Sequence, residues 1–105
     1  MSDTLDRTFQ ALADPTRRAV VTRLAAGPAS VGDLAAPHAM ALPSFLKHIG
    51  ILEEAGLIHT EKVGRVRTCR LDTQRFGEVR GWLDAQRALW EARTDQLQAL
   101  VEARQ

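Results

Sequence analysis

The sequence predicts a mainly α-helical domain with one small β-hairpin, and the spacing of its apolar residues carries this prediction. Apolar residues recur at helical intervals of three and four positions through most of the 105 residues. Between residues 57 and 71 this spacing gives way to a β-like pattern centred on a glycine, and helical spacing then returns to about residue 103. We therefore expect a single domain over residues 1–105.

The composition excludes several other classes of protein. With 45% hydrophobic and 26% charged residues, the chain is an ordinary globular one rather than a disordered or low-complexity chain. No apolar stretch predicts a signal peptide or a membrane span, so we expect a cytoplasmic location and no membrane partner. A net charge of +1 is too small to indicate general binding to polyanions, so a nucleic-acid site requires local clustering of cations.

Two helices are predicted at the start of the chain. Leu5, Phe9 and Leu12 are spaced i, i+4, i+7, which places them on one face of the first helix. The second helix opens with Asp14 as N-cap and Pro15 in its first turn, and it stops at the following Gly-Pro pair. The arginines expected to face solvent or an anionic partner are Arg17, Arg18 and Arg23.

A helix-turn-helix is predicted next. Ser30, with Asp33 three residues later, forms a weak capping box for a short third helix that Pro37 ends. A fourth helix follows after a tight turn, and two short helices joined in this way form a helix-turn-helix. The apolar stripe of the fourth helix is Leu42, Phe45, Leu46, Ile49 and Leu52, and its other side carries Ser44, Lys47, His48 and Ile51.

A basic β-hairpin is predicted over residues 57–71. Gly56 fits the left-handed position that closes a helix, and the hairpin turns at Val63, Gly64 and Arg65. Positive charge is concentrated here, because four cations fall within nine residues that contain no acid. These cations are Lys62, Arg65, Arg67 and Arg70.

A last helix, capped by Asp72 or Thr73, is predicted to continue to about residue 103. A helix of some thirty residues is about 45 Å long, so much of its apolar stripe stays exposed in a monomer. We therefore expect a homodimer that pairs through the first and last helices, with a core over about residues 4–72 and a dimerisation helix over about 73–103. The expected interface residues are Leu5, Phe9, Trp82, Leu83, Leu89, Trp90, Leu97 and Leu100.

In this order the elements form a winged helix-turn-helix of about five helices plus a two-stranded wing. Four blocks, over about residues 4–101, resemble successive blocks of the ArsR-type winged-helix transcriptional repressors. The resemblance implies a homodimeric regulator that binds double-stranded DNA, most directly a repressor on a palindromic operator, and not an enzyme. The blocks are FQALADPTRRAVVTRLAAGPASVGDLA, MALPSFLKHIGILEEAGLI, KVGRVRTCRLD and WLDAQRALWEARTDQL.

The expected DNA-binding residues lie on the fourth helix and on the wing. A major groove about 12 Å wide admits one helix. Ser44 could contact a phosphate or a base edge, and Lys47 is expected at a phosphate. For His48, a base contact, a phosphate contact and a plain surface position stay open. The complete expected set is Pro43, Ser44, Lys47, His48, Lys62, Arg65 and Arg67.

Departures from the family pattern argue against its two standard metal sites. Relatives that sense thiophilic metals have Cys-x-Cys at the third helix, where this chain has no cysteine. Relatives that bind zinc between the last helices use Asp-x-His and two further ligands; Asp84 fits the aspartate, but Gln86, Leu97 and Leu100 occupy the other positions. No metal or cofactor is predicted, and no effector is indicated.

Some alternatives stay open. A winged helix can serve as a protein-interaction module, although the retained cations argue against that. Cys69 could be a redox switch if Arg67 and Arg70 lowered its pKa, whereas packing under the wing is the favoured role. Trp82 and Trp90 could form an aromatic ligand box, with interface packing favoured. A hydrolase using Cys69 is not indicated, since no nucleophile turn or phosphate loop is present.

Overall fold

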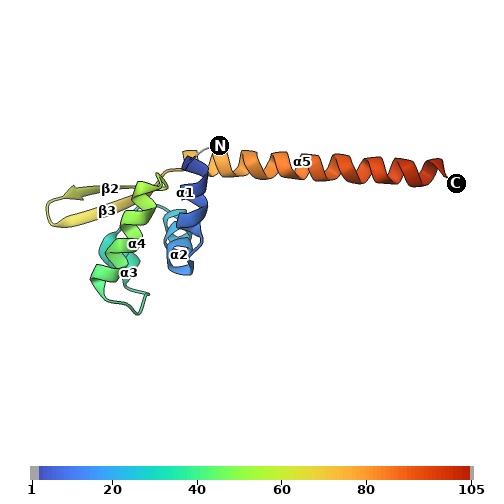
Figure 1. The fold of residues 1–105 in the computed structure, drawn as a ribbon. Helices are drawn as coiled ribbons and strands as arrows, with labels where there is room; N and C mark the ends of the chain where they lie inside the picture. Colours follow the sequence, from blue (N-terminus) through green and yellow to red (C-terminus); the bar gives the residue numbers. More distant parts are fainter. Residues whose placement is uncertain (1–2, 105) are drawn as a thin grey trace.

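The computed structural model describes residues 3–104, and this part of the chain contains five helices and a three-stranded antiparallel sheet. Figure 1 shows the first four helices and the sheet gathered into one body, with the β2–β3 hairpin projecting on one side and α5 on the other. The elements are α1 (Asp3–Leu12), α2 (Pro15–Leu24), β1 (Ala29–Ser30), α3 (Val31–Ala35), α4 (Leu42–Glu54), β2 (Ile58–Val63), β3 (Val66–Leu71) and α5 (Gln74–Ala103). Residues 1, 2 and 105 of the predicted domain lie outside the described residues.

Side-chain caps begin α2 and α3 as the sequence predicts. The Asp14 carboxylate accepts a hydrogen bond from the backbone N–H of Arg17 at 3.0 Å, and proline occupies the first turn of α2. The Ser30 hydroxyl accepts from the backbone N–H of Asp33 at 3.1 Å. Each cap satisfies a backbone donor that the first turn of a helix leaves unpaired.

The predicted hairpin is confirmed, with a two-residue turn rather than a three-residue one. Val63 pairs with Val66 inside the ladder, which leaves Gly64 and Arg65 as the turn. Gly64 has φ +63° and Gly56, which closes α4, has φ +76°. Residues with a side chain are strained in this region, so glycine at both positions has a conformational cause.

The two-stranded wing is confirmed as β2 and β3, and β1 adds a third strand that the sequence did not predict, in the order β1-β3-β2. Ala29 pairs with Cys69, and Ser30 pairs with Thr68. This strand joins the helix-turn-helix to the base of the wing. Two residues are too few to show a β-like alternation, and they form a strand only because β3 lies beside them.

One core lies among the first four helices and the base of the sheet. Phe45, Ile49 and Leu52 of α4 are buried in it as predicted. Leu42 and Leu46 were also assigned to this stripe, and that assignment was wrong: they are 54% and 39% exposed, at the edge of the buried face. The complete core is Ala11, Val20, Leu24, Ala29, Val31, Leu34, Phe45, Ile49, Leu52, Ala55, Leu57, Ile58 and Cys69.

Helix α5 is as long as the sequence predicts. Thr73 stands at its N-cap without a side-chain hydrogen bond, while the Asp72 carboxylate accepts from the backbone N–H of Gln74 at 2.9 Å. The same carboxylate lies 2.5 Å from Nε2 of His59 in β2. The backbone hydrogen bond is the larger cause, and the His59 contact the next, of a lowered pKa of Asp72.

No residue of α5 is buried, and the described chain is 71 Å in its longest dimension. Within residues 3–104, none of the helices combines the length and the apolar character that a membrane span requires.

Candidate nucleic-acid interface

The exposed side of α4 begins with an uncapped first turn. Ala41 is the N-cap residue and offers no side-chain hydrogen bond, and Pro43 stands within the first two helical positions. Ser44 and Lys47 are both exposed on the turns that follow. Unpaired N–H groups and the positive end of the helix dipole favour an anion at such a turn. This end of α4 therefore combines backbone donors, a hydroxyl and an ammonium group.

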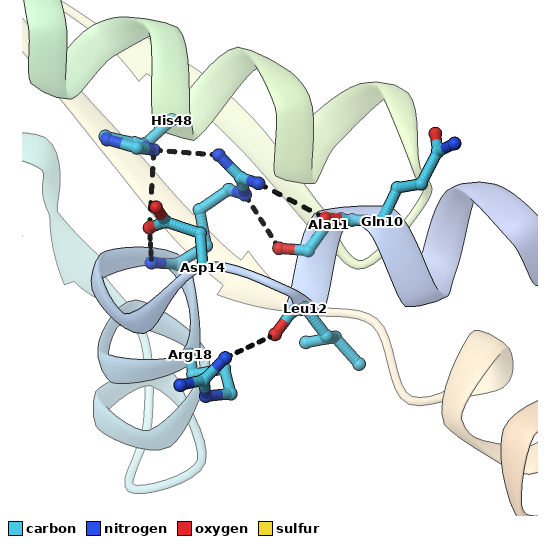
Figure 2. A network of polar contacts seen from close by, with 7 residues as sticks. Gln10, Ala11, Leu12, Asp14, Arg18 and His48 are labelled. Atoms are coloured by element: carbon cyan, nitrogen blue, oxygen red, sulfur yellow. Dashed lines mark hydrogen bonds and ion pairs between the residues drawn. The ribbon is translucent and has the colours of Figure 1, made fainter.

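His48 is held against α2 and is not a free surface histidine. Its side chain is 21% exposed, and its Nδ1 lies 3.0 Å from Nη1 of Arg17 and 3.7 Å from Oδ2 of Asp14 (Figure 2). A guanidinium group only donates hydrogen bonds, so Nδ1 accepts and the proton of the neutral ring is on Nε2. Only Nε2 is then left to act as a donor to DNA.

Arg17 and Arg18 both donate to carbonyls at the end of α1; Arg17 is half-buried and not solvent-facing as predicted, whereas Arg18 is exposed as predicted. Arg17 donates from Nε to the carbonyl of Ala11 at 2.7 Å and from Nη2 to that of Gln10 at 3.2 Å. Arg18 donates from Nη1 to the carbonyl of Leu12 at 2.9 Å (Figure 2). The last turn of α1 has no basic residue of its own, so the first turn of α2 satisfies its terminal carbonyls. The packing of α1 on α2 thereby fixes Arg17, and Arg17 in turn contacts α4.

The carboxylate of Asp14 lies at the same contact between α2 and α4. The pKa of Asp14 is lowered chiefly by the hydrogen bond from the backbone N–H of Arg17; burial opposes this, and the charge of Arg17 lowers the pKa further. Asp14 thus caps α2 and also faces the ring of His48. These three side chains link α2 to α4, in addition to the core contacts of α4.

The cations of the wing are exposed to solvent. Lys62 and Arg67 are register partners on β2 and β3, and Arg65 lies in the turn. All three are exposed. Like charges directly opposite each other in a ladder repel, and an anion placed between them relieves that repulsion.

Cys69 lies at the other end of the wing, fully buried in the core. Burial raises the pKa of its thiol, and the charge of Glu53 raises it further, while Arg67 lowers it less. The shift is opposite to the one that a redox switch requires, because the thiolate is the reactive form. Within residues 3–104 no three His, Cys, Asp or Glu side chains gather as a metal site would need.

The predicted interface residues of α1 and α5 form a largely uncovered apolar surface. The ring of Phe9 packs edge to face on that of Trp82, with centroids 5.8 Å apart, and Phe9 is still 39% exposed. Thr8 and Ala11 of α1 are buried instead, and Leu12 packs against the core. Along α5 the exposed apolar side chains are Trp82 43%, Leu83 50%, Leu89 67%, Trp90 68%, Leu97 58%, Leu100 54% and Val101 58%.

Known proteins are similar to this chain in fold and in sequence. A family model described as a helix-turn-helix domain matches residues 12–61. The HTH-type transcriptional regulator Rv2034 of Mycobacterium tuberculosis (strain ATCC 25618 / H37Rv) is 42% identical over 79 residues, which are 75% of this chain and 74% of that protein. The crystal structure of an ArsR family transcriptional regulator is 57% identical, with a TM-score of 0.83, and covers 85% of this chain and 92% of that one. The chain belongs to the ArsR family of transcriptional regulators.

A second curated relative extends the similarity of this ArsR regulator. The transcriptional repressor SdpR of Bacillus subtilis (strain 168) is 29% identical over 79 residues, or 75% of this chain and 88% of that protein. The family and the winged helix-turn-helix expected from the sequence are thus confirmed. Members of this family regulate transcription through DNA-binding domains and are not enzymes.

The sequence of this ArsR regulator did not predict that Arg17 and Asp14 contact His48. The signal that could have indicated the junction is the motif Asp-Pro-Thr-Arg-Arg directly after α1, where two arginines follow a helix whose last turn has no cation. The pairing with His48 spans 31 positions and depends on the angle between α2 and α4, which periodicity does not give.

Proposed function

We propose that this ArsR regulator is a homodimeric repressor that binds a palindromic operator in double-stranded DNA. The observation that carries the proposal is the contrast between two sets of cations. Within residues 3–104, the lysines and arginines of α4 and the wing form no ion pair, whereas three arginines of α5 pair with acids on the same helix. The unpaired set is Lys47, Lys62, Arg65 and Arg67, and the paired set is Arg75, Arg80 and Arg87.

In this proposal α4 enters the major groove and the wing follows the adjacent backbone or minor groove. Pro43 brings the uncapped turn of α4 toward the phosphates, Lys47 contacts a phosphate, and Ser44 contacts a phosphate or a base edge. His48 reaches DNA only through its Nε2 donor, and its larger contribution is to hold α4 in place through Arg17.

The dimer in this proposal forms through α1 and α5. The exposed apolar side chains of α5 favour a second chain as their cover, because so large an uncovered apolar surface is unusual for a monomer. A two-fold axis through paired α5 helices would set the two α4 helices at a fixed separation, which a palindromic operator matches. The repressor name of the SdpR relative supports the direction of regulation, and we propose the cytoplasm as the place of action.

The test is a selection of bound fragments from random DNA, followed by affinity measurements over a range of salt concentrations. If each protomer neutralises three or four phosphates, the log-log slope of affinity against salt is about −5 to −7. Lys47→Ala should weaken binding to all sequences and reduce the slope by about 2 per dimer, whereas Ser44→Ala should change sequence preference. Arg87→Ala, which removes a cation of α5, is the control and should leave the slope unchanged.

A salt slope near zero would refute DNA binding through these cations. An equal loss on every sequence for the Ser44, Lys47 and His48 variants would instead refute the division of roles within α4. A single half-site as the selected motif would refute the palindromic operator.

A further inference from the structure

A cleft between α1, α2 and α4 is not used by the proposed DNA or dimer surfaces. Its volume is about 770 Å³, which lies within the range of small-molecule sites. Ala11 and Ala55 are almost fully buried at its base, and Ile51 is 40% exposed on its wall. The base is thus apolar while the rim is polar.

The cleft lies on the far side of α1 from the apolar surface. Arg7 and Gln10 of α1 line it. At 100° per residue, these positions lie more than 90° around the helix from Leu5, Phe9 and Leu12. A partner that covers the Phe9–Trp82 surface therefore leaves the cleft open to solvent.

The rim carries more positive than negative charge. Arg7 is exposed and forms no hydrogen bond or ion pair within residues 3–104, and Arg17 lines the opposite wall. Arg17 uses three of its five N–H groups on Ala11, Gln10 and His48, so two remain for another acceptor. Glu54 contributes the one carboxylate among the lining residues.

We propose that this cleft binds a small organic carboxylate with an apolar body. Two guanidinium groups over an apolar base suit a carboxylate head and a hydrocarbon body. The charge of Glu54 disfavours a dianion such as a phosphate monoester, and the polar rim disfavours a purely apolar ligand. A carboxylate is therefore a better match than either.

A ligand in this cleft also acts on α4 through Arg17, and this part of the proposal rests on the proposed function. Arg17 donates both to the carbonyls at the end of α1 and to His48 on α4. A carboxylate bound to the two free N–H groups draws the Arg17 guanidinium toward itself and away from Nδ1 of His48. Occupation of the cleft would then loosen the contact that positions α4 and lower the affinity for DNA.

The test is a titration of the full chain with 2-naphthoate, followed by amide chemical shifts in NMR spectra without DNA. We expect saturable shifts at Arg7, Ala11 and Ile51, and at least tenfold weaker binding of 2-naphthamide, which has the same shape and no charge. Arg7→Ala should weaken 2-naphthoate about fivefold, and Glu54→Gln should strengthen it severalfold. Arg80→Ala, at a comparably exposed arginine of α5, is the matched control and should have no effect.

Equal binding of the amide, or no effect of Arg7→Ala, overturns the proposal, and so do shifts confined to the apolar residues of α5. Because Arg7 has no contact that folding needs, its variant keeps the test valid. The titration contains no DNA, so its failure is distinct from failure of the proposed function. In a second measurement, 2-naphthoate should weaken DNA binding of the wild type more than that of Arg7→Ala; equal weakening overturns the route through Arg17.

Discussion

Between residues 3 and 72 the large apolar side chains are mostly covered, whereas no residue of α5 is buried. Within the described residues, no buried side-chain polar atom lacks a partner. In the body, side chains at the start of one helix pair with backbone carbonyls at the end of the previous one: Arg17 of α2 donates to the carbonyl of Ala11 in α1. At its start, helix α5 packs Phe76 against the core and Trp82 on Phe9, and beyond Trp82 its described side-chain ion pairs and hydrogen bonds lie within the helix itself. The body thus encloses its own core, while α5 keeps an exposed apolar surface.

The largest effect is expected from a charge placed in the middle of that surface. Leu97→Glu should convert the proposed dimer into monomers at micromolar concentration, because a buried carboxylate at a two-fold interface meets its own copy. Loss of the second DNA-binding unit should then weaken operator binding about a hundredfold or more. Sedimentation velocity and fluorescence anisotropy with operator DNA measure the two effects.

Ala88→Glu is the matched control for this change. Ala88 is exposed on the opposite side of α5, so the same charge should leave both mass and affinity unchanged. A Leu97→Glu protein that still sediments as a dimer would show that the two copies pair elsewhere. Far-ultraviolet circular dichroism should show a folded body in both variants.

A smaller effect is expected within the body at the end of α4. Gly56→Ala should destabilise the fold by about 1–2 kcal/mol, since Gly56 has φ +76° and an added Cβ would lie 2.9 Å from Nε of Arg75. Gly50→Ala is the control: its Cβ would meet nothing within 4 Å, and alanine should stabilise the helix by about 0.5–1 kcal/mol. Urea denaturation at one fixed protein concentration compares them, and equal effects of the two changes would contradict this account.

The comparison also separates what the sequence could predict from what it could not. Predictable features depend on a few neighbouring residues: the caps Asp14 and Ser30, the glycines of the two turns, and the uninterrupted pattern of α5. These signals act within one turn or one helix, so spacing alone reveals them. The length of α5 also predicts that its apolar residues are exposed in a single chain, because no compact domain of this size can bury them.

The features that were missed depend on how elements meet. Strand β1 exists only through its pairing with β3, and Leu46 is exposed at the edge of the face by which α4 packs on the body. At the candidate site, the exposed positions of Ser44 and Lys47 follow from helical spacing. The contact of His48 with Arg17 does not, because it requires the crossing of α2 and α4. Tertiary geometry thus sets the contacts of His48, the residue whose role spacing left open.

The smallest effect, in pH dependence, should come from Asp14, where the body meets α4. Its folded pKa is lowered, so its contribution to stability is present above its unfolded pKa, near 4, and is lost as pH falls through the lower folded value. Asp14→Ala should lower the thermal midpoint at pH 7 by a few degrees through loss of the cap. Asp14→Ser keeps an oxygen for the Arg17 N–H without the charge, so its difference from wild type should shrink below about pH 4. Asp72, whose pKa is also lowered, is present in every variant and cancels in the comparison. A wild-type and Asp14→Ser difference that stays constant from pH 7 to pH 3 would mean that the Asp14 charge adds nothing beyond the cap.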